Sequence, residues 1–250
     1  MQATRPVYAG LFLVTLATLM FEILLTRIFS VTMWYHFAFV AISVAMFGMT
    51  GGALLVYLAR NFFSADKTQF HMSLSALLFG VTMVAAFLIH LAIPGITGGS
   101  NFAPLALSLT YVVISIPFGF SGICVCLALT RFTRQVGRVY AADLAGAATG
   151  CIVIIYALKI TDGPTAVILC AVIACFGATA LGLSCAHPWV MRISRIAAIS
   201  LGSFVIGNTV LVHAQQPLLR LVWVRGEKEA RPMYERWNSF SRIIVDGDPS

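Results

Sequence analysis

Long apolar runs, separated by short polar connections, make up most of the chain. Seven runs are near or above the roughly 20 residues that a helix needs to cross a bilayer. The chain is 60% hydrophobic and only 10% charged, whereas soluble domains carry about 25% charged residues. The pattern predicts an all-α polytopic membrane protein with about seven transmembrane helices. The expected spans are residues 7–26, 37–58, 72–93, 104–130, 141–158, 164–185 and 193–213.

Two of these spans contain features that could interrupt a membrane helix. The fourth holds Pro117, with Gly119 and Gly122 close behind, and this combination predicts a kink or a break. The fifth, residues 141–158, is the shortest and is rich in alanine and glycine. It could therefore be a re-entrant segment, in which case the tail beyond it would emerge on the opposite side of the membrane.

Lysines and arginines are divided unequally between alternate connections. One set of connections holds eight of them, and the other holds only Arg27 and Lys159. Because basic residues are enriched on the cytoplasmic side, the bias predicts a cytoplasmic N-terminus in a bacterial inner membrane and a periplasmic tail. The scatter of the +7 net charge fits the lipid bilayer as partner and argues against nucleic acid. The eight basic residues of the richer set of connections are Arg5, Arg60, Lys67, Arg131, Arg134, Arg138, Arg192 and Arg195.

The character of the chain changes after the predicted membrane domain, residues 1–214. Residues 215–236 are dense in charge and are interpreted as a solvated connector. Trp237–Val245 is aromatic and β-branched and precedes Asp246-Gly247, which is typical of a strand entering a tight turn. Since a lone strand has little stability, residues 237–250 are interpreted as the first strand of a truncated or missing soluble domain. The alternative is a strand that pairs with a partner protein.

Four stretches, in order along the chain, resemble one protein family. Gly137-Arg-Val-Tyr-Ala-Ala-Asp-Leu-Ala-Gly-Ala-Ala-Thr-Gly150 is similar to a signature in the membrane region of bacterial fused spermidine synthase-like proteins. Phe21–Arg27, Ile116–Gly122 and Trp237–Arg242 resemble other parts of that family. The resemblance implies a multi-pass domain ahead of a soluble aminopropyltransferase- or methyltransferase-like domain. The matching positions are Gly137, Arg138, Tyr140, Asp143, Gly146, Gly150, Trp237, Asn238 and Ser239.

No residue of the chain is assigned a catalytic role. Active members of such a family need a glycine-rich nucleotide loop after a strand, with an acidic residue further on for the ribose. Nothing after Trp237 supplies this loop, so no cofactor is predicted in this chain, and whether the full-length protein is an enzyme stays open. Two alternatives to a transferase anchor also stay open: a small-solute or proton-coupled transporter, and a non-enzymatic subunit of a membrane complex.

Glu22, Arg27 and Asp143 are the candidate polar sites within the membrane, where a charged side chain is costly. Glu22 is either a proton or cation site or the ion-pair partner of Arg27, five positions later. Asp143 either binds a cation such as a polyamine, or relays protons, or caps the start of the fifth helix or pairs there with the nearby Arg138 or Tyr140. Seven spans would place Glu22 and Asp143 near opposite faces of the membrane, so they are not expected to share one site.

Small residues and histidines within the spans are explained by helix packing and by the membrane interface, without a bound ligand. The four-residue spacing of Gly48 with Gly52, and of Gly146 with Gly150, predicts close packing between helices. Three histidines map to the predicted periplasmic side and could hold a metal or haem, but their positions at span ends favour interfacial polar residues. No metal site is predicted. These histidines are His36, His90 and His213.

Overall fold

The computed structural model describes residues 2–33, 35–93, 103–183, 187–238 and 241–247. Within these residues it contains seven α-helices, each long and apolar enough to cross a membrane. This confirms the predicted fold class. The helices are α1 (Arg5–Thr32), α2 (Phe37–Leu58), α3 (Thr68–Ala92), α4 (Ala103–Arg131), α5 (Val136–Ile160), α6 (Gly163–Gly182) and α7 (Pro188–His213).

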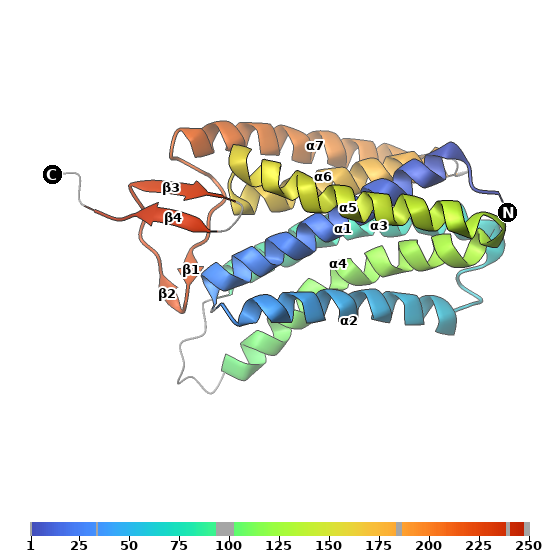
Figure 1. Cartoon of the computed structure of the whole chain (residues 1–250), viewed down its shortest axis with the longest axis horizontal. Helices are drawn as coiled ribbons and strands as arrows, with labels where there is room; N and C mark the ends of the chain where they lie inside the picture. The colour runs from blue at the N-terminus through green and yellow to red at the C-terminus, as the bar shows by residue number, and fades with distance from the viewer. Residues whose placement is uncertain (1, 34, 94–102, 184–186, 239–240, 248–250) are drawn as a thin grey trace.

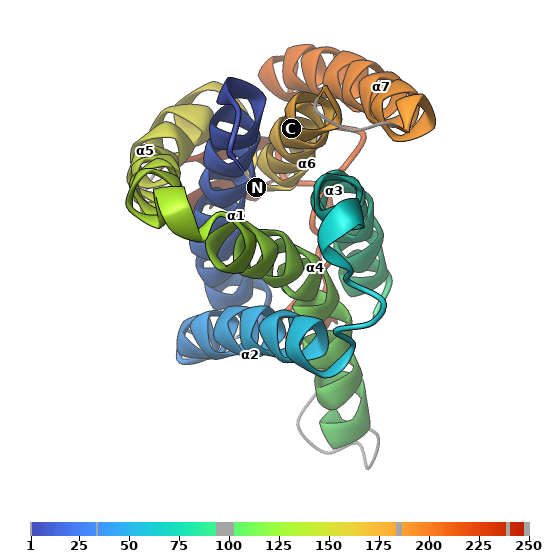
Figure 2. The same cartoon turned by 90° about the vertical axis from the view of Figure 1, so that its right-hand side faces the viewer.

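The helices form one bundle in which α1 and α6 occupy the inside (Figure 2). α1 packs against α2, α5 and α6, while α6 packs against α1, α3 and α7, and α4 bridges α2 and α3. Aromatic side chains fill the interior: Phe21 of α1 and Phe118 of α4 are both fully buried, and their rings stack 5.2 Å apart. α7 buries few residues and lies at the periphery.

The bundle has two distinct ends, because successive helices run in opposite directions (Figure 1). The chain starts at one end, called here the N-terminal end. α1, α5 and α7 finish at the other, called here the tail end, where the chain after α7 is also found. All eight basic residues of the richer set flank helix boundaries at the N-terminal end.

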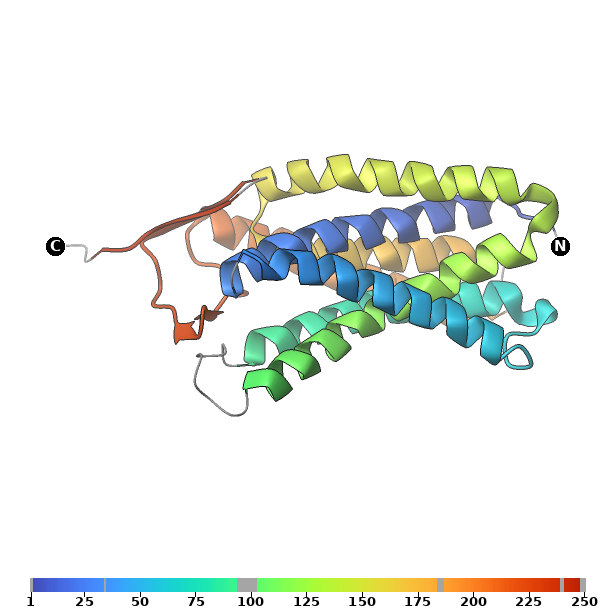
Figure 3. The same ribbon diagram turned by 60° about the horizontal axis from the view of Figure 1, so that its bottom comes forward.

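The two spans with interrupting features are both continuous helices. α4 passes through Pro117 without a break, and it changes direction in its middle (Figure 1). α5 has 25 residues and runs alongside the whole bundle (Figure 3). The re-entrant interpretation of residues 141–158 is therefore wrong, because the small residues of α5 pack along α1 instead of turning back.

The tail folds into two antiparallel hairpins. β1 (Trp223–Val224) pairs with β2 (Glu227–Lys228), and β3 (Tyr234–Trp237) pairs with β4 (Arg242–Val245). Arg225 and Gly226 join the first pair with positive φ angles of 51° and 89°. Such a two-residue loop matches the twist of its strands, and glycine adopts positive φ without strain.

The structure corrects two expectations about the tail. Trp237–Val245 is not a single strand, because it bends back after Trp237 and finds its partner upstream in β3. Residues 215–236 are not simply a solvated connector. Leu221 is fully buried, and the backbone N–H of Arg225 donates a hydrogen bond of 2.7 Å to the carbonyl oxygen of Thr32 at the end of α1.

Candidate functional site

The β3–β4 hairpin holds the tail against the bundle through an indole ring. Side chains alternate along a strand, so Glu235 and Trp237 share one face, and that face is turned towards the helices. Trp237 is only 4% exposed and lies over Gly163, the first residue of α6. A Cβ at Gly163 would stand 2.9 Å from two carbons of the indole ring. Only glycine leaves room for this contact.

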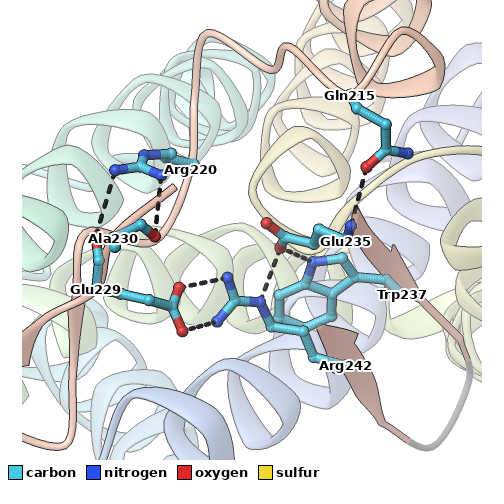
Figure 4. Close-up of polar contacts among 7 residues, drawn as sticks. All are labelled: Gln215, Arg220, Glu229, Ala230, Glu235, Trp237 and Arg242. Atoms are coloured by element: carbon cyan, nitrogen blue, oxygen red, sulfur yellow. Dashed lines mark hydrogen bonds and ion pairs between the residues drawn. The ribbon is translucent and has the colours of Figure 1, made fainter. Parts of the chain in front are cut away.

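A partly buried ion-pair network formed by Arg242 of β4 also fixes the hairpin (Figure 4). The Arg242 guanidinium donates to both oxygens of Glu229, at 2.9 and 2.6 Å, and its Nε donates to Glu235 Oε1 at 2.8 Å. The same Glu235 oxygen accepts a hydrogen bond from Trp237 Nε1 at 2.8 Å. Burial alone would lower the pKa of Arg242, but Glu235 and Glu229 outweigh it and hold that pKa above its usual value.

Asn208 ties the tail to two helices from within α7. Its side chain is 1% exposed, and its Nδ2 donates to Thr165 Oγ1 of α6 at 2.7 Å. Its Oδ1 accepts a hydrogen bond of 2.8 Å from the backbone N–H of Leu218 in the tail. Gln215 extends the attachment, since its Oε1 accepts from the backbone N–H of Glu235 at 2.9 Å (Figure 4).

Asp162 lies beneath the hairpin, between α5 and α6. It caps α6: its Oδ1 accepts a 3.0 Å hydrogen bond from the backbone N–H of Thr165. Its side chain is buried, and this burial raises its pKa to about 6, against the lowering effect of Thr165 and with a further raising effect from Glu235. A cavity of about 250 Å³ beside it is also lined by His213 and Arg236.

Asp143 is not a helix cap. α5 begins at Val136, its capping residue is Gln135, and Asp143 is therefore two turns inside the helix. The capping interpretation failed because the helix starts five residues earlier than the apolar run. The backbone carbonyl of Asp143 accepts a hydrogen bond from Thr15 Oγ1 at 3.0 Å, which places this residue against the first half of α1.

Glu22 and Arg27 do not form the expected ion pair. Both are described, yet no ion pair or hydrogen bond joins their side chains, and Arg27 Nε is buried without a hydrogen-bond partner. Both line one cavity among α1, α2 and α5, and Asp143 is not part of its lining. The two carboxylates do not line one cavity, but Asp143 lies level with Thr15, only seven residues before Glu22 along α1, so they are not at opposite ends of the bundle.

The four glycines lie at helix–helix contacts. A Cβ at Gly48 or Gly52 would strike the backbone carbonyls of Ser115 or Gly119 in α4, respectively. A Cβ at Gly146 would strike the backbone of Phe12, and one at Gly150 would lie 2.6 Å from the carbonyl oxygen of Leu16. Close α2–α4 and α1–α5 packing therefore depends on these positions.

The family-motif positions lie along α5, from its first turn to its middle, and in the β3–β4 hairpin at the tail end. Gly137, Arg138 and Tyr140 are exposed in the first turns of α5, at the N-terminal end. Trp237 and Asn238 belong to the β3–β4 hairpin at the tail end. Ser239 lies outside the described residues. These positions therefore do not converge on one site.

The three histidines occupy three separate environments. His36 precedes α2 and contacts Phe37, with ring centroids 4.6 Å apart. His90 is buried in α3 beside Phe29, and His213 ends α7 next to the tail. Within the part of the chain that the structure describes, no group of three His, Cys, Asp or Glu side chains could hold a metal ion.

Asp162, Asn208 and Arg242 are the important polar residues that sequence reasoning missed. Asp162-Gly163-Pro164 carries a usable signal, because an aspartate followed by proline is typical of a helix start. Asn208, a lone polar residue within an apolar span, offers a weaker one. The partners of Arg242 could not be read from sequence, since its pairing with Glu229 spans 13 positions and a chain reversal.

Comparison with protein-family models, with curated proteins and with solved structures finds no match to this chain.

Proposed function

We propose that this chain is the membrane-embedded region of a spermidine synthase-like protein, and that it anchors a soluble transferase-like domain at the tail end of the bundle. The observation that carries the proposal is the rigid attachment of the β3–β4 hairpin through Trp237, Arg242 and Asn208. A flexible linker would not need a partly buried ion-pair network. An anchor that positions a following domain would.

The outward face of the hairpin supports the same proposal. Tyr234, Ile243 and Val245 alternate with the bundle-facing residues and are 40%, 49% and 50% exposed. A two-stranded ribbon with an apolar outer face is a ready surface for further strands or a packed domain. The resemblance of Trp237–Arg242 to the start of the family's soluble part is the reason why we propose that domain as the occupant.

We further propose a bacterial inner-membrane location with a cytoplasmic N-terminal end and a periplasmic tail end. The support is the concentration of basic residues at the N-terminal end, where they would face the cytoplasm. The separation of Glu22 from Asp143 favours the anchor over a transporter that would use both carboxylates.

Cysteine labelling tests both proposals. Ile243→Cys on the outward face should react readily in the 250-residue chain and be protected in the protein made from the longer reading frame. Asp66→Cys, exposed at the N-terminal end, is the matched control and should react equally in both. In whole cells an impermeant reagent should reach Ile243→Cys but not Asp66→Cys.

Two outcomes would contradict these proposals. A native reading frame that stops at Ser250 would exclude a domain in cis and favour a partner protein that completes the hairpin's sheet. Labelling of Asp66→Cys, and not of Ile243→Cys, in intact cells would show that the topology is the reverse of the proposed one.

A further inference from the structure

A cavity of about 430 Å³ lies among α1, α2 and α5, on the tail-end side of Asp143. α1 contributes Glu22 and Arg27 to its lining, and α2 contributes Ile42. α5 contributes Cys151 and Ile155. Cavities of a few hundred Å³ are typical of sites for small molecules. Since Ile42 and Ile155 are 41% and 42% exposed, the cavity reaches the outer surface of the bundle.

The two charged side chains in this cavity have no partners in the described structure. Arg27 Nε is buried without a hydrogen-bond acceptor, and no ion pair joins Arg27 to Glu22. Charged groups within a membrane normally pair with one another, with backbone carbonyls or with water in a cavity. Here a carboxylate and a guanidinium share one space and remain available to a third group.

The combination of charges restricts what that group can be. A cation without an anionic group would be repelled by Arg27, and an anion without a cationic group would be repelled by Glu22. A molecule that carries both charges is matched to both side chains. The remaining walls are mainly aliphatic and include Ile23 and Ile154, so the molecule also needs an apolar part.

We propose that this cavity binds a zwitterionic amphiphile, with its ammonium group at Glu22 and its carboxylate or phosphate at Arg27. Arg27 lies five residues further along α1, which is about 7.5 Å nearer the tail end at the usual helical rise. The two binding groups are therefore separated along the length of the cavity. The aliphatic part packs against the isoleucine walls. This site is independent of the tail's role as an anchor.

Two sources offer this chemistry, and the experiment separates them. The protein, purified in detergent and stripped of lipid, is titrated with individual ligands and bound species are counted by native mass spectrometry. Leucine represents a free zwitterion, with leucinol (no carboxylate) and 4-methylpentanoate (no ammonium) as matched controls. Phosphatidylethanolamine represents a zwitterionic headgroup, with phosphatidylglycerol as the anionic control.

At least one zwitterion is expected to bind about tenfold more tightly than its single-charge controls. Glu22→Gln and Arg27→Gln should each remove this preference, whereas Asp143→Asn, on the same α1–α5 contact but outside the cavity, should keep it. Cys151→Trp fills the cavity from α5 without altering a charge. It should also remove binding. This variant keeps the proposal testable if Arg27→Gln does not fold.

Preference for leucine alone would identify a solute site, and preference for phosphatidylethanolamine alone a lipid site. Equal binding of zwitterions and single-charge controls by the wild-type chain would overturn the proposal. So would a preference that survives Glu22→Gln and Cys151→Trp.

Discussion

The indole ring of Trp237 lies so close over Gly163 that a Cβ on this glycine would come within 2.9 Å of the ring. Seventy-four positions separate the two residues in the chain, and their contact joins the tail to the start of α6. Because Gly163 directly follows the cap Asp162, the hairpin is held against a rigid helix terminus. The tail is consequently a structural extension of the bundle.

Gly163→Ala should release the hairpin from the bundle. The added Cβ meets the ring of a buried tryptophan, so the hairpin must shift even though alanine otherwise favours a helix. Trypsin should then cleave after Arg236 several-fold faster than in the wild type. Gly207→Ala in α7 is the matched control, because a Cβ there meets no described atom within 4 Å. Equal cleavage of both variants would show that the Trp237 contact does not hold the tail.

Arg242→Gln should strongly destabilise the tail. It leaves Glu229 and Glu235, whose side chains are each 13% exposed, without their shared cation. Breaking a buried pair by removing one partner costs roughly 3 kcal/mol. The loss should appear as faster hydrogen exchange of the β3 and β4 backbone amides. Adding Glu229→Gln and Glu235→Gln should restore part of the protection, because the uncompensated charges are then removed. Additive losses across the three changes would argue against a coupled network.

Asp162→Asn should change how stability depends on pH. Burial raises the pKa of Asp162 to about 6 in the folded chain, above its ordinary value of 3.8. The folded state thus holds the proton more tightly than the unfolded state. The contribution of Asp162 to stability is fully present below about pH 3.8 and is lost as the pH rises through about 6.

The measurement is the difference between the melting temperatures of wild type and Asp162→Asn, taken from pH 4 to pH 8. Asparagine caps helices about as well as aspartate but does not titrate. Subtracting the two melting temperatures therefore removes the pH-dependent contribution of the other ionisable groups, which both proteins share. We expect wild-type stability to fall relative to the variant by on the order of 2–3 kcal/mol over this range. A difference that stays constant from pH 4 to pH 8 would contradict the raised pKa.

Gly52→Ala should separate α2 from α4. Its Cβ would strike the backbone carbonyl of Gly119, which cannot move away as a side chain can. Overpacking of this kind typically costs about 1–3 kcal/mol, and the melting temperature in detergent should fall accordingly. Gly51→Ala, one position away, is the matched control, since no described atom lies within 4 Å of its added Cβ. A fall of equal size in both variants would show that the loss does not depend on the contact between α2 and Gly119, because alanine by itself favours a helix.

The number of apolar helices followed from the sequence, because an apolar run of about 20 residues is the length that crosses a bilayer as a helix, whereas the four strands of the tail did not. Residues 37–58 were predicted with their observed bounds, and the other helices differ by a few residues at their ends. The four-residue glycine spacing likewise located surfaces such as Gly52, since close helix approach has a local signature. What local pattern could not show was where α5 begins. Helix α5 begins among polar residues, before the apolar run. Asp143 therefore lies in the interior of the helix and is not its cap.

The sequence by itself determined that this protein is a seven-helix membrane bundle with a strand-forming tail, because apolar length and small-residue spacing are properties of single segments. Only the tertiary structure decided which distant groups meet. It placed Trp237 on Gly163 and Arg242 between two glutamates, and it left Glu22 and Arg27 unpaired around one cavity. These relationships depend on how helices and hairpins are oriented against one another, which no periodicity along the chain encodes.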